Sequence, residues 1–270
     1  MKYFVVSDVH SFFYELMNAL DDKGFDVNNQ EHKLIVCGDL FDRSDQAVEL
    51  FEFVKSLGDR FIYVRGNHED LLFDCYKELQ VGFGCGRHHV SNGTVDTIIQ
   101  FTGLSYYNLM VNTPERNEVL KEKLEPLLDF ITDKSVNYFE VGDYVFVHGW
   151  LPEIPNKEVY PWWDNSKDLY DADWRNASDL DWESARWLNG MKEWKRGIHE
   201  DGKTIVCGHW HCSYGWSHIR QERKEFPQKN QKDWLKSFEP FIDDGIVAID
   251  ACTAYTGKVN CIVLEVEDDG

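Results

Sequence analysis

Five short polar stretches, each at the end of an apolar stretch, constrain what this chain can fold into more than any other feature. They are Asp8-Val9-His10, Gly38-Asp39-Leu40-Phe41-Asp42-Arg43, Gly66-Asn67-His68-Glu69, Val147-His148-Gly149 and Gly208-His209-Trp210-His211. In open α/β sheets, ligands bind just beyond the carboxyl ends of the strands. We therefore expect the five stretches to converge on one site.

The N-terminal part of the chain repeats one pattern three times: an apolar strand, a polar turn and an amphipathic helix. Continuous apolar runs of this length are typical of strands that are buried on both faces. The expected strands are 2–6, 33–37 and 60–64. The expected helices are 12–21, 44–54 and 71–79. Alternating strands and helices predict an α/β (α+β) fold.

Between residues 82 and 133 the pattern changes. A glycine-rich loop leads to two expected helices, 94–101 and 114–131, which we interpret as a helical cap or insertion in a single domain spanning 1–270. Further strands are expected at 136–140, 144–148, 203–207, 245–250 and 258–266. We expect the last two to pair as a closing hairpin and the tail 267–270 to fray.

Hydrophobic residues make up 43% of the chain and aromatic residues 14%, which indicates a folded globular protein. No apolar run reaches the roughly eighteen residues of a transmembrane helix. Residues 1–6 enter a strand at once and show no signal-peptide pattern. These features predict a cytoplasmic protein that does not bind a membrane. The seven cysteines show no C-x-x-C spacing and are expected to be reduced thiols.

The net charge of −20 weighs against binding a long nucleic acid, because that affinity depends mostly on neutralising phosphates. It does not exclude a small phosphorylated substrate, since bound divalent ions reverse the local field. Nine of the ten tryptophans lie between residues 150 and 216. We expect most of them to pack inside the protein and a few to form an aromatic rim over the site.

The polar stretches supply imidazole and carboxylate ligands together, a combination that suits manganese, iron or zinc better than magnesium or calcium. We expect two divalent ions that share the carboxylate of Asp39. The expected ligands of the first ion are Asp8, His10, Asp39 and His211. The expected ligands of the second ion are Asp39, Asn67, His148 and His209. Two ions held about 3.5–4 Å apart activate a water for attack on phosphorus.

Three side chains beside these ligands suit phosphoryl transfer. His68 is expected to turn away from the metals and to act as the general acid, with Asp42 keeping it protonated. Arg43 offers a planar fork for two phosphoryl oxygens. Arg43, Asn67 and His68 are the expected contacts of the substrate phosphate. Glu69 is expected to hold Arg43 in place.

In order and spacing, the stretches from Asp8 to His211 resemble the calcineurin-like metallophosphoesterase superfamily. The second and third stretches are most similar to the phosphoprotein phosphatase branch, which contains serine/threonine phosphatases and symmetrical diadenosine tetraphosphate hydrolases. The resemblance implies a four-layer α/β/β/α sandwich with a dimetal site at the sheet edges. It also implies the ligand sets given above.

Two departures from the protein phosphatases bear on the substrate. Ser11 and Ser44 stand where those enzymes usually carry glycine, and Gly208–His211 has the G-H-x-H form of the wider superfamily. Our leading interpretation is a dimetal phosphoesterase that hydrolyses phosphomonoesters with metal-activated water, and specifically a serine/threonine protein phosphatase. The partner is then a phosphoprotein or a small phosphate ester. The alternatives are a dinucleoside polyphosphate hydrolase, a phosphodiesterase and an inactive metal-binding scaffold.

Overall fold

Successive residues of the central strands face two different hydrophobic layers. In β1 (Lys2–Val6), Phe4 belongs to one buried cluster, whereas Tyr3 and Val5 belong to another. In β9 (Thr204–Cys207), Val206 lies in the same cluster as Val5, and Ile205 lies in a third. Because side chains alternate between the two faces of a strand, two sheets share one hydrophobic layer and each has a second layer outside it.

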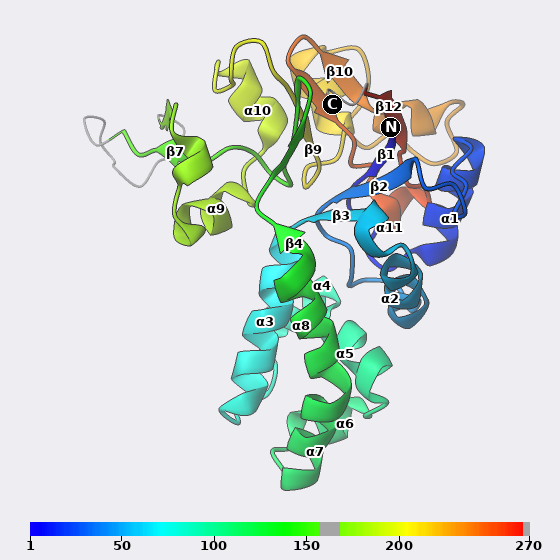
Figure 1. Ribbon diagram of the computed structural model, residues 1–270, viewed down its shortest axis with the longest axis vertical. Coiled ribbons are helices and arrows are strands. Elements are labelled where there is room, and N and C mark those ends of the chain that lie inside the picture. Colours follow the sequence, from blue (N-terminus) through cyan, green and yellow to red (C-terminus); the bar gives the residue numbers. More distant parts are fainter. Residues whose placement is uncertain (157–167, 267–270) are drawn as a thin grey trace.

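The computed structural model describes residues 1–156 and 168–266 and shows two five-stranded sheets with helices on their outer faces (Figure 1). The first sheet has the order β12-β1-β2-β3-β4 and the second β10-β11-β9-β6-β5. Besides β1, the first sheet contains β2 (His32–Cys37), β3 (Phe61–Val64), β4 (Ser135–Val136) and β12 (Ile262–Glu265). The second sheet also contains β5 (Phe139–Val141), β6 (Tyr144–Phe146), β10 (Phe241–Asp243) and β11 (Ile246–Ala248). A separate ribbon pairs β7 (Glu153–Ile154) with β8 (Leu169–Tyr170).

The inner strands of both sheets run parallel, and antiparallel strands lie at three of the edges. β1, β2, β3 and β4 are parallel in the first sheet, as are β6, β9 and β11 in the second. β12 pairs antiparallel with β1, so that Glu265 lies opposite Lys2. Parallel strands present their carboxyl ends at one edge. The polar stretches that follow β1, β2, β3, β6 and β9 therefore leave the sheets on the same side.

Helices cover the sandwich and also build an arm that extends from it (Figure 1). α1 (Phe13–Asp22) and α2 (Ala47–Ser56) pack on the first sheet. α9 (Asp179–Ala185) and α10 (Gly190–Lys195) pack on the second sheet, and α11 (Thr253–Thr256) follows β11.

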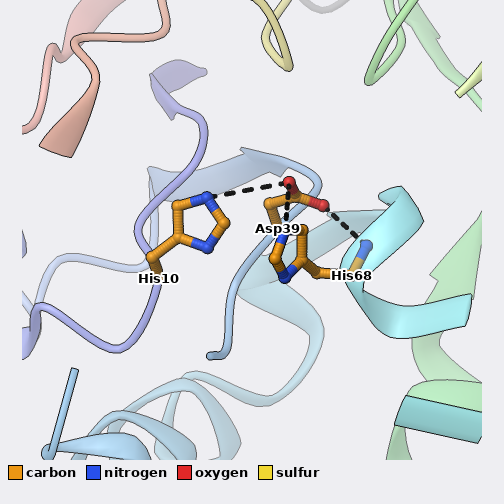
Figure 2. Close-up of side chains that lie close together, drawn as sticks. All are labelled: His10, Asp39 and His68. Atoms are coloured by element: carbon orange, nitrogen blue, oxygen red, sulfur yellow. Dashed lines mark hydrogen bonds and ion pairs between the residues drawn. The ribbon is translucent and has the colours of Figure 1, made fainter. Parts of the chain in front are cut away.

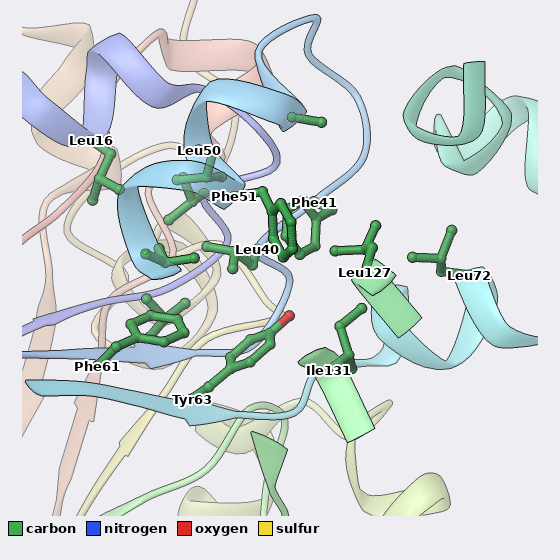
Figure 3. Close-up of a cluster of buried hydrophobic side chains, with 14 of the residues drawn as sticks. Leu16, Leu40, Phe41, Leu50, Phe51, Phe61, Tyr63, Leu72, Leu127 and Ile131 are labelled. Carbon is green, nitrogen blue, oxygen red and sulfur yellow. The ribbon is translucent and has the colours of Figure 1, made fainter. Parts of the chain in front are cut away.

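The arm contains helices α3 to α8 and is joined to the sandwich by a continuous hydrophobic core. Its helices are α3 (Asn67–Gln80), α4 (Arg87–Asn92), α5 (Thr94–Thr102), α6 (Tyr106–Met110), α7 (Pro114–Val119) and α8 (Glu125–Lys134). A π-helical turn, Leu120–Leu124, links α7 to α8. Figure 3 shows Leu127 and Ile131 of α8 beside Phe41 and Phe51 from the sandwich. Burying these side chains together fixes the base of the arm against the first sheet.

The predicted α/β/β/α sandwich is confirmed, and the expected helices 94–101 and 114–131 correspond to α5 and to α7 through α8. The predicted closing hairpin is wrong, because β11 pairs with β9 and β10 while β12 pairs with β1 in the other sheet. Both segments are apolar, and an apolar pattern alone does not select a partner strand. The tail 267–270 and the tryptophans Trp162 and Trp163 lie outside the described residues.

Among the helices that the structure describes, none combines the length and the apolar character needed to cross a bilayer.

Gly38, at the end of β2, occupies a position that only glycine fits. Its φ is +78°, and a Cβ atom there would lie 2.4 Å from His148 Nδ1 and 2.7 Å from Gly66 Cα. Gly24 has nearly the same φ, +79°, but a Cβ atom there would meet open space. The two glycines therefore separate the cost of backbone strain from the cost of a steric clash.

We expect Gly24→Ala to lower the free energy of unfolding by about 1–2 kcal/mol, the cost of the left-handed backbone. Gly38→Ala should lower it by about 2–5 kcal/mol, because overpacking adds a further 1–3 kcal/mol. Urea denaturation of the two variants and the wild type measures both values. Equal losses in the two variants would show that the close approach at Gly38 carries no additional cost.

Candidate active site

Six residues of the polar turns adopt a backbone conformation that residues other than glycine rarely adopt. Their φ angles lie between 50° and 76°, and they are Asp8, His10, Asp39, Asp42, Arg43 and His209. Each such conformation costs of the order of 1–3 kcal/mol and persists only where the surroundings fix it. Strained residues of this kind gather at functional sites, which marks this edge of the sandwich.

A pocket of about 440 Å³ lies where these strand ends meet. Most of the predicted site residues line it: Asp8, His10, Asp39, Arg43, Asn67, His68, His209 and His211. The two other predicted site residues, Asp42 and His148, are buried and contact the lining residues His68 and Asn67. The convergence of the five polar stretches is thus a feature of the structure.

Asp39 lies at the centre of this arrangement. Its Oδ1 lies 3.3 Å from His148 Nε2, and its Oδ2 lies 3.7 Å from His10 Nε2 and 3.9 Å from His68 Nε2. Figure 2 shows His10 and His68 close to the carboxylate, and both approach its Oδ2 atom. Burial raises the pKa of Asp39, but the surrounding histidines, His148 first, lower it well below its usual range. Asp39 is therefore ionised at neutral pH.

Three histidines use one ring nitrogen to bind the backbone and leave the other for the site. His148 Nδ1 donates to the Cys37 carbonyl at 2.9 Å, and His10 Nδ1 donates to the Phe41 carbonyl at 3.1 Å. The ring of His209 hydrogen-bonds to the backbone of Trp187. Such bonds fix the tautomer and the ring orientation of metal-binding histidines.

Two of these imidazoles are held in the neutral form, which is the form that binds metal ions. Burial lowers the pKa of His209 to about 3, with a further contribution from His148. Burial, Arg43 and His68 together lower the pKa of His10 well below its ordinary value. Both rings therefore present a free lone pair at neutral pH.

Two groups of side chains bring their ligand atoms within 4.8 Å of one another, and both contain Asp39. One group is Asp39, His148 and His209, which are three of the four ligands expected for the second ion. The fourth, Asn67, places Oδ1 2.8 Å from His148 Nε2. The other group is His10, Asp39 and His68. A carboxylate shared by two clusters of nitrogen donors is the kind of donor set that a dimetal centre uses.

Asp8 adds a second carboxylate to the first-ion side of the pocket. It accepts hydrogen bonds from the His209 backbone N–H at 3.0 and 3.2 Å. Burial raises the pKa of Asp8 well above its ordinary value, and the carboxylates of Asp250 and Asp39 raise it further. Buried carboxylates so close together are stable as anions only with a compensating cation. The residues present therefore fit a divalent ion.

His211 also lines the pocket. Its Nδ1 lies 2.8 Å from Ser213 Oγ, and its Nε2 lies 3.8 Å from Glu225 Oε1. The ring packs against Phe226 with a centroid distance of 4.7 Å. His211 as a ligand of the first ion, together with Asp8, stays a prediction.

His68 is held between Asp42 and Arg43. Its Nδ1 lies 2.8 Å from Asp42 Oδ2, and its Nε2 lies 3.1 Å from Arg43 Nη2. Burial alone would lower the pKa of His68, but Asp39 and Asp42 outweigh it and raise the pKa above its ordinary value. A histidine with a raised pKa that lines the pocket beside a guanidinium is suited to protonating a leaving oxygen.

Glu69 binds the backbone of both central turns. Its carboxylate accepts hydrogen bonds from the amides of Asp39, Leu40 and Gly66, at 3.1, 3.0 and 2.8 Å. The expectation that Glu69 holds Arg43 is therefore wrong. The three backbone amides after β2 and β3 would otherwise be buried without an acceptor, and Glu69 supplies one.

Several lining residues were not singled out from the sequence. They are Asn92, Asp250, Cys252 and Thr253, whereas the lining residue Trp187 belongs to the tryptophan-rich segment 150–216, from which an aromatic rim was expected. Asp250 follows β11. A polar residue directly after an apolar strand is the same pattern that marks the five polar stretches. Asn92 belongs to the arm, and its approach to the pocket has no local sequence signal.

Residues 1–240 match the sequence profile of the calcineurin-like phosphoesterases. The chain belongs to this family. It is accordingly a metallophosphoesterase, a hydrolase of phosphoric esters, and the resemblance inferred from its motifs is confirmed.

Several similar proteins are named symmetrical bis(5'-nucleosyl)-tetraphosphatases. A symmetrical bis(5'-nucleosyl)-tetraphosphatase from Aromatoleum aromaticum is 35% identical over 57% of this chain and 47% of its own length. Another from Buchnera aphidicola is 36% identical over 30% of this chain and 28% of its own. The chain thus spans less than half the length of either relative. A solved protein-tyrosine phosphatase from a psychrophilic Shewanella is 16% identical, with a TM-score of 0.47 over 98% of this chain and 75% of that one.

Asp39→Asn should remove metal and activity together, because it halves the charge available to two cations and leaves only one good donor oxygen. We expect the variant to bind less than half of the wild-type metal, measured by elemental analysis after dialysis. Asp59→Asn, a change at an exposed aspartate, is the control and should retain all of it. Full metal content in Asp39→Asn would contradict the central role of Asp39.

His68→Asn should keep the metal content and lose turnover, because it removes the candidate acid and leaves the predicted ligands His10, Asp39 and His148 in place. General acids contribute about 10²–10⁴-fold to rate, so the loss should approach this range for poor leaving groups and be smaller for 4-nitrophenolate. Steady-state kinetics with a series of aryl phosphates measures the difference. His88→Asn, at an exposed histidine outside the pocket, is the control. Loss of metal with retained turnover would reverse the assignment.

Proposed function

We propose that this metallophosphoesterase hydrolyses dinucleoside polyphosphates of the bis(5'-nucleosyl) tetraphosphate type. The proposal rests on the pocket, where two exposed indoles stand beside the metal-binding groups. Trp187 is 46% exposed and Trp210 is 36% exposed, and both line the pocket that contains Asp39. Large aromatic surfaces are seldom left in water beside a site unless a ligand covers them.

The two indoles are held by contacts through neighbouring rings. Trp187 packs edge-to-face with the ring of His209, with centroids 5.7 Å apart and an interplanar angle of 86°. Trp210 packs in the same way on Tyr214, at 5.5 Å and 74°. Fixed aromatic rings next to a phosphate site suit stacking with nucleobases, which is worth about 1–3 kcal/mol per base.

The similar proteins support the same substrate class, since the curated relatives named above are symmetrical bis(5'-nucleosyl)-tetraphosphatases. The leading sequence-based interpretation, a serine/threonine protein phosphatase, receives no such support. We therefore place the dinucleotide first and treat the phosphoprotein as an outcome of the test below. A cytoplasmic location is retained as part of the proposal.

We propose two divalent ions as cofactors, manganese, iron or zinc, held by Asp8, His10, Asp39, Asn67, His148, His209 and His211. When bound, such ions activate water and neutralise charge on the phosphoryl oxygens. Asn67, His68 and Arg43 then bind the substrate phosphate, with Arg43 presenting two N–H groups in one plane. His68 donates its Nε2 proton to the leaving oxygen, while Asp42 stabilises the ring through Nδ1.

Hydrolysis at the central bridge of the tetraphosphate consumes one water and yields two nucleoside diphosphates. Cleavage elsewhere in the chain yields a monophosphate and a triphosphate. Product analysis therefore distinguishes symmetrical from asymmetrical cleavage.

The test uses protein stripped of metal and reloaded with Mn²⁺. We expect diadenosine tetraphosphate to give a higher kcat/KM than 4-nitrophenyl phosphate, bis-4-nitrophenyl phosphate or a phosphoserine peptide, with ADP as the product. Preference for the peptide would restore the protein phosphatase, and preference for the diester would indicate a phosphodiesterase. Lack of turnover of all four would indicate the inactive scaffold.

Trp187→Ala and Trp210→Ala should each raise the KM for diadenosine tetraphosphate by about tenfold, because each removes a stacking surface worth about 1–3 kcal/mol. The rate with 4-nitrophenyl phosphate and the metal content should stay at wild-type levels. Trp187→Phe and Trp210→Phe keep an aromatic face and should restore most of the affinity. Unchanged KM in both alanine variants would remove the tryptophans from substrate binding.

A further inference from the structure

Asp42 is a buried carboxylate whose oxygens are bound by two threonines as well as by His68. Thr97 Oγ1 donates to Oδ1 at 2.7 Å, and Thr94 Oγ1 donates to Oδ2 at 2.8 Å. The Thr97 hydroxyl also accepts a hydrogen bond from the Asp42 backbone N–H at 3.0 Å. Asp42 and both threonines are completely buried. The carboxylate is thus held on both oxygens, with no freedom to rotate away from His68.

Both threonines come from α5, a helix of the arm that packs against the β2 turn. α5 starts directly after Gly93, whose φ is +85° and where a Cβ atom would lie 2.4 Å from Arg43 N. One turn beyond Thr97, the Gln100 amide donates to the Ser44 carbonyl at 2.9 Å and accepts from Ala47 N–H at 2.8 Å. One side of α5 therefore binds the whole segment from Asp42 to Ala47.

This packing determines how His68 faces the pocket. Asp42 Oδ2 accepts from Thr94 on one side and from His68 Nδ1 on the other. Fixing Nδ1–H on the carboxylate leaves Nε2 pointing at Arg43 and the pocket. A histidine whose ring is oriented by a third group is the arrangement that acid–base sites use. Here the third group is itself oriented by a helix of the insertion.

We propose that Thr94 and Thr97 are positioning residues for the hydrolytic reaction, acting through Asp42 to hold His68 with Nε2 toward the substrate phosphate. The arm that carries these threonines therefore helps to position the acid. The inference rests on the proposed function in so far as His68 is taken as the acid.

The test compares hydroxyl removal with hydroxyl retention. Thr94→Val, Thr97→Val and the double variant keep the shape of the side chains and lose the hydrogen bonds to Asp42. Thr94→Ser and Thr97→Ser keep the hydroxyls. Thr102→Val is the matched control, because Thr102 lies in the same helix and its hydroxyl donates to the Ile98 carbonyl at 2.7 Å.

The kinetic readout is kcat and KM in Mn²⁺-loaded protein with phenyl phosphate and 4-nitrophenyl phosphate. The double variant should lose about tenfold or more in kcat for phenyl phosphate, part of the 10²–10⁴-fold that a general acid supplies. The loss for 4-nitrophenyl phosphate should be smaller, and KM should change by less than about twofold. The serine variants and Thr102→Val should keep wild-type kcat.

A second readout does not require any substrate. In Zn²⁺-loaded protein with ¹⁵N-labelled histidine, the His68 Nδ1–H resonance, assigned by its loss in His68→Asn, should be protected from solvent exchange. It should broaden or disappear in Thr97→Val and in the double variant, and persist in Thr97→Ser and Thr102→Val. This result can hold even where the proposed dinucleotide substrate fails.

The proposal is overturned if the double variant keeps both the resonance and wild-type kcat. It is equally overturned if Thr97→Ser or Thr102→Val loses as much kcat as Thr97→Val, because helix stability would then explain the effect. If the double variant does not fold, the two single valine variants decide: each should lose about threefold or more in kcat for phenyl phosphate, and wild-type values in both overturn the proposal.

Discussion

The site depends on keeping one buried carboxylate, that of Asp39, ionised. Burial opposes the charge, and the surrounding imidazoles outweigh that cost. The same imidazoles are held by backbone carbonyls at Cys37 and Phe41, so their positions follow from the ends of the strands. Glu69 completes the arrangement, because it joins the turn that carries Asp39 to the turn at Gly66. The positions of the expected ligands are therefore determined by the positions of the strand ends.

Two sheets are needed because the donors come from both. Asp39 and Asn67 follow strands of the first sheet, whereas His148 and His209 follow strands of the second. The shared layer of Val5, Val206 and their neighbours sets the distance between the sheets. A change of volume in that layer would move one half of the ligand set relative to the other, since close-packed interiors transmit strain.

Much of the fold and most of the pocket could be predicted, because the informative residues sit in turns directly after apolar strands. Asp39 and His68 are examples, since short motifs place them whatever the rest of the chain does. The partners of Asp42 could not be predicted, because Thr94 and Thr97 lie more than fifty residues away and threonines in a helix are unremarkable. The role of Glu69 was misjudged, because backbone amides leave no trace in a sequence. The pairing of β12 with β1 was missed for the same reason that the closing hairpin was wrong. An apolar pattern predicts a strand but does not indicate which strand it pairs with.

The long-range hydrogen bonds of Asp8 affect how the protein reaches its folded form. Thr253 donates to the Asp8 carbonyl across a separation of 245 residues, and His209 donates to the Asp8 carboxylate across 201. Contacts of such long range make folding slow, because the chain loses much entropy before they form. A nascent chain that has emerged only as far as α8 contains Asp8, Asp39 and His68 but lacks His209 and Thr253, the distant partners of Asp8. The pocket is therefore complete only once the second sheet has formed, because His209, His211 and Asp250 follow its strands.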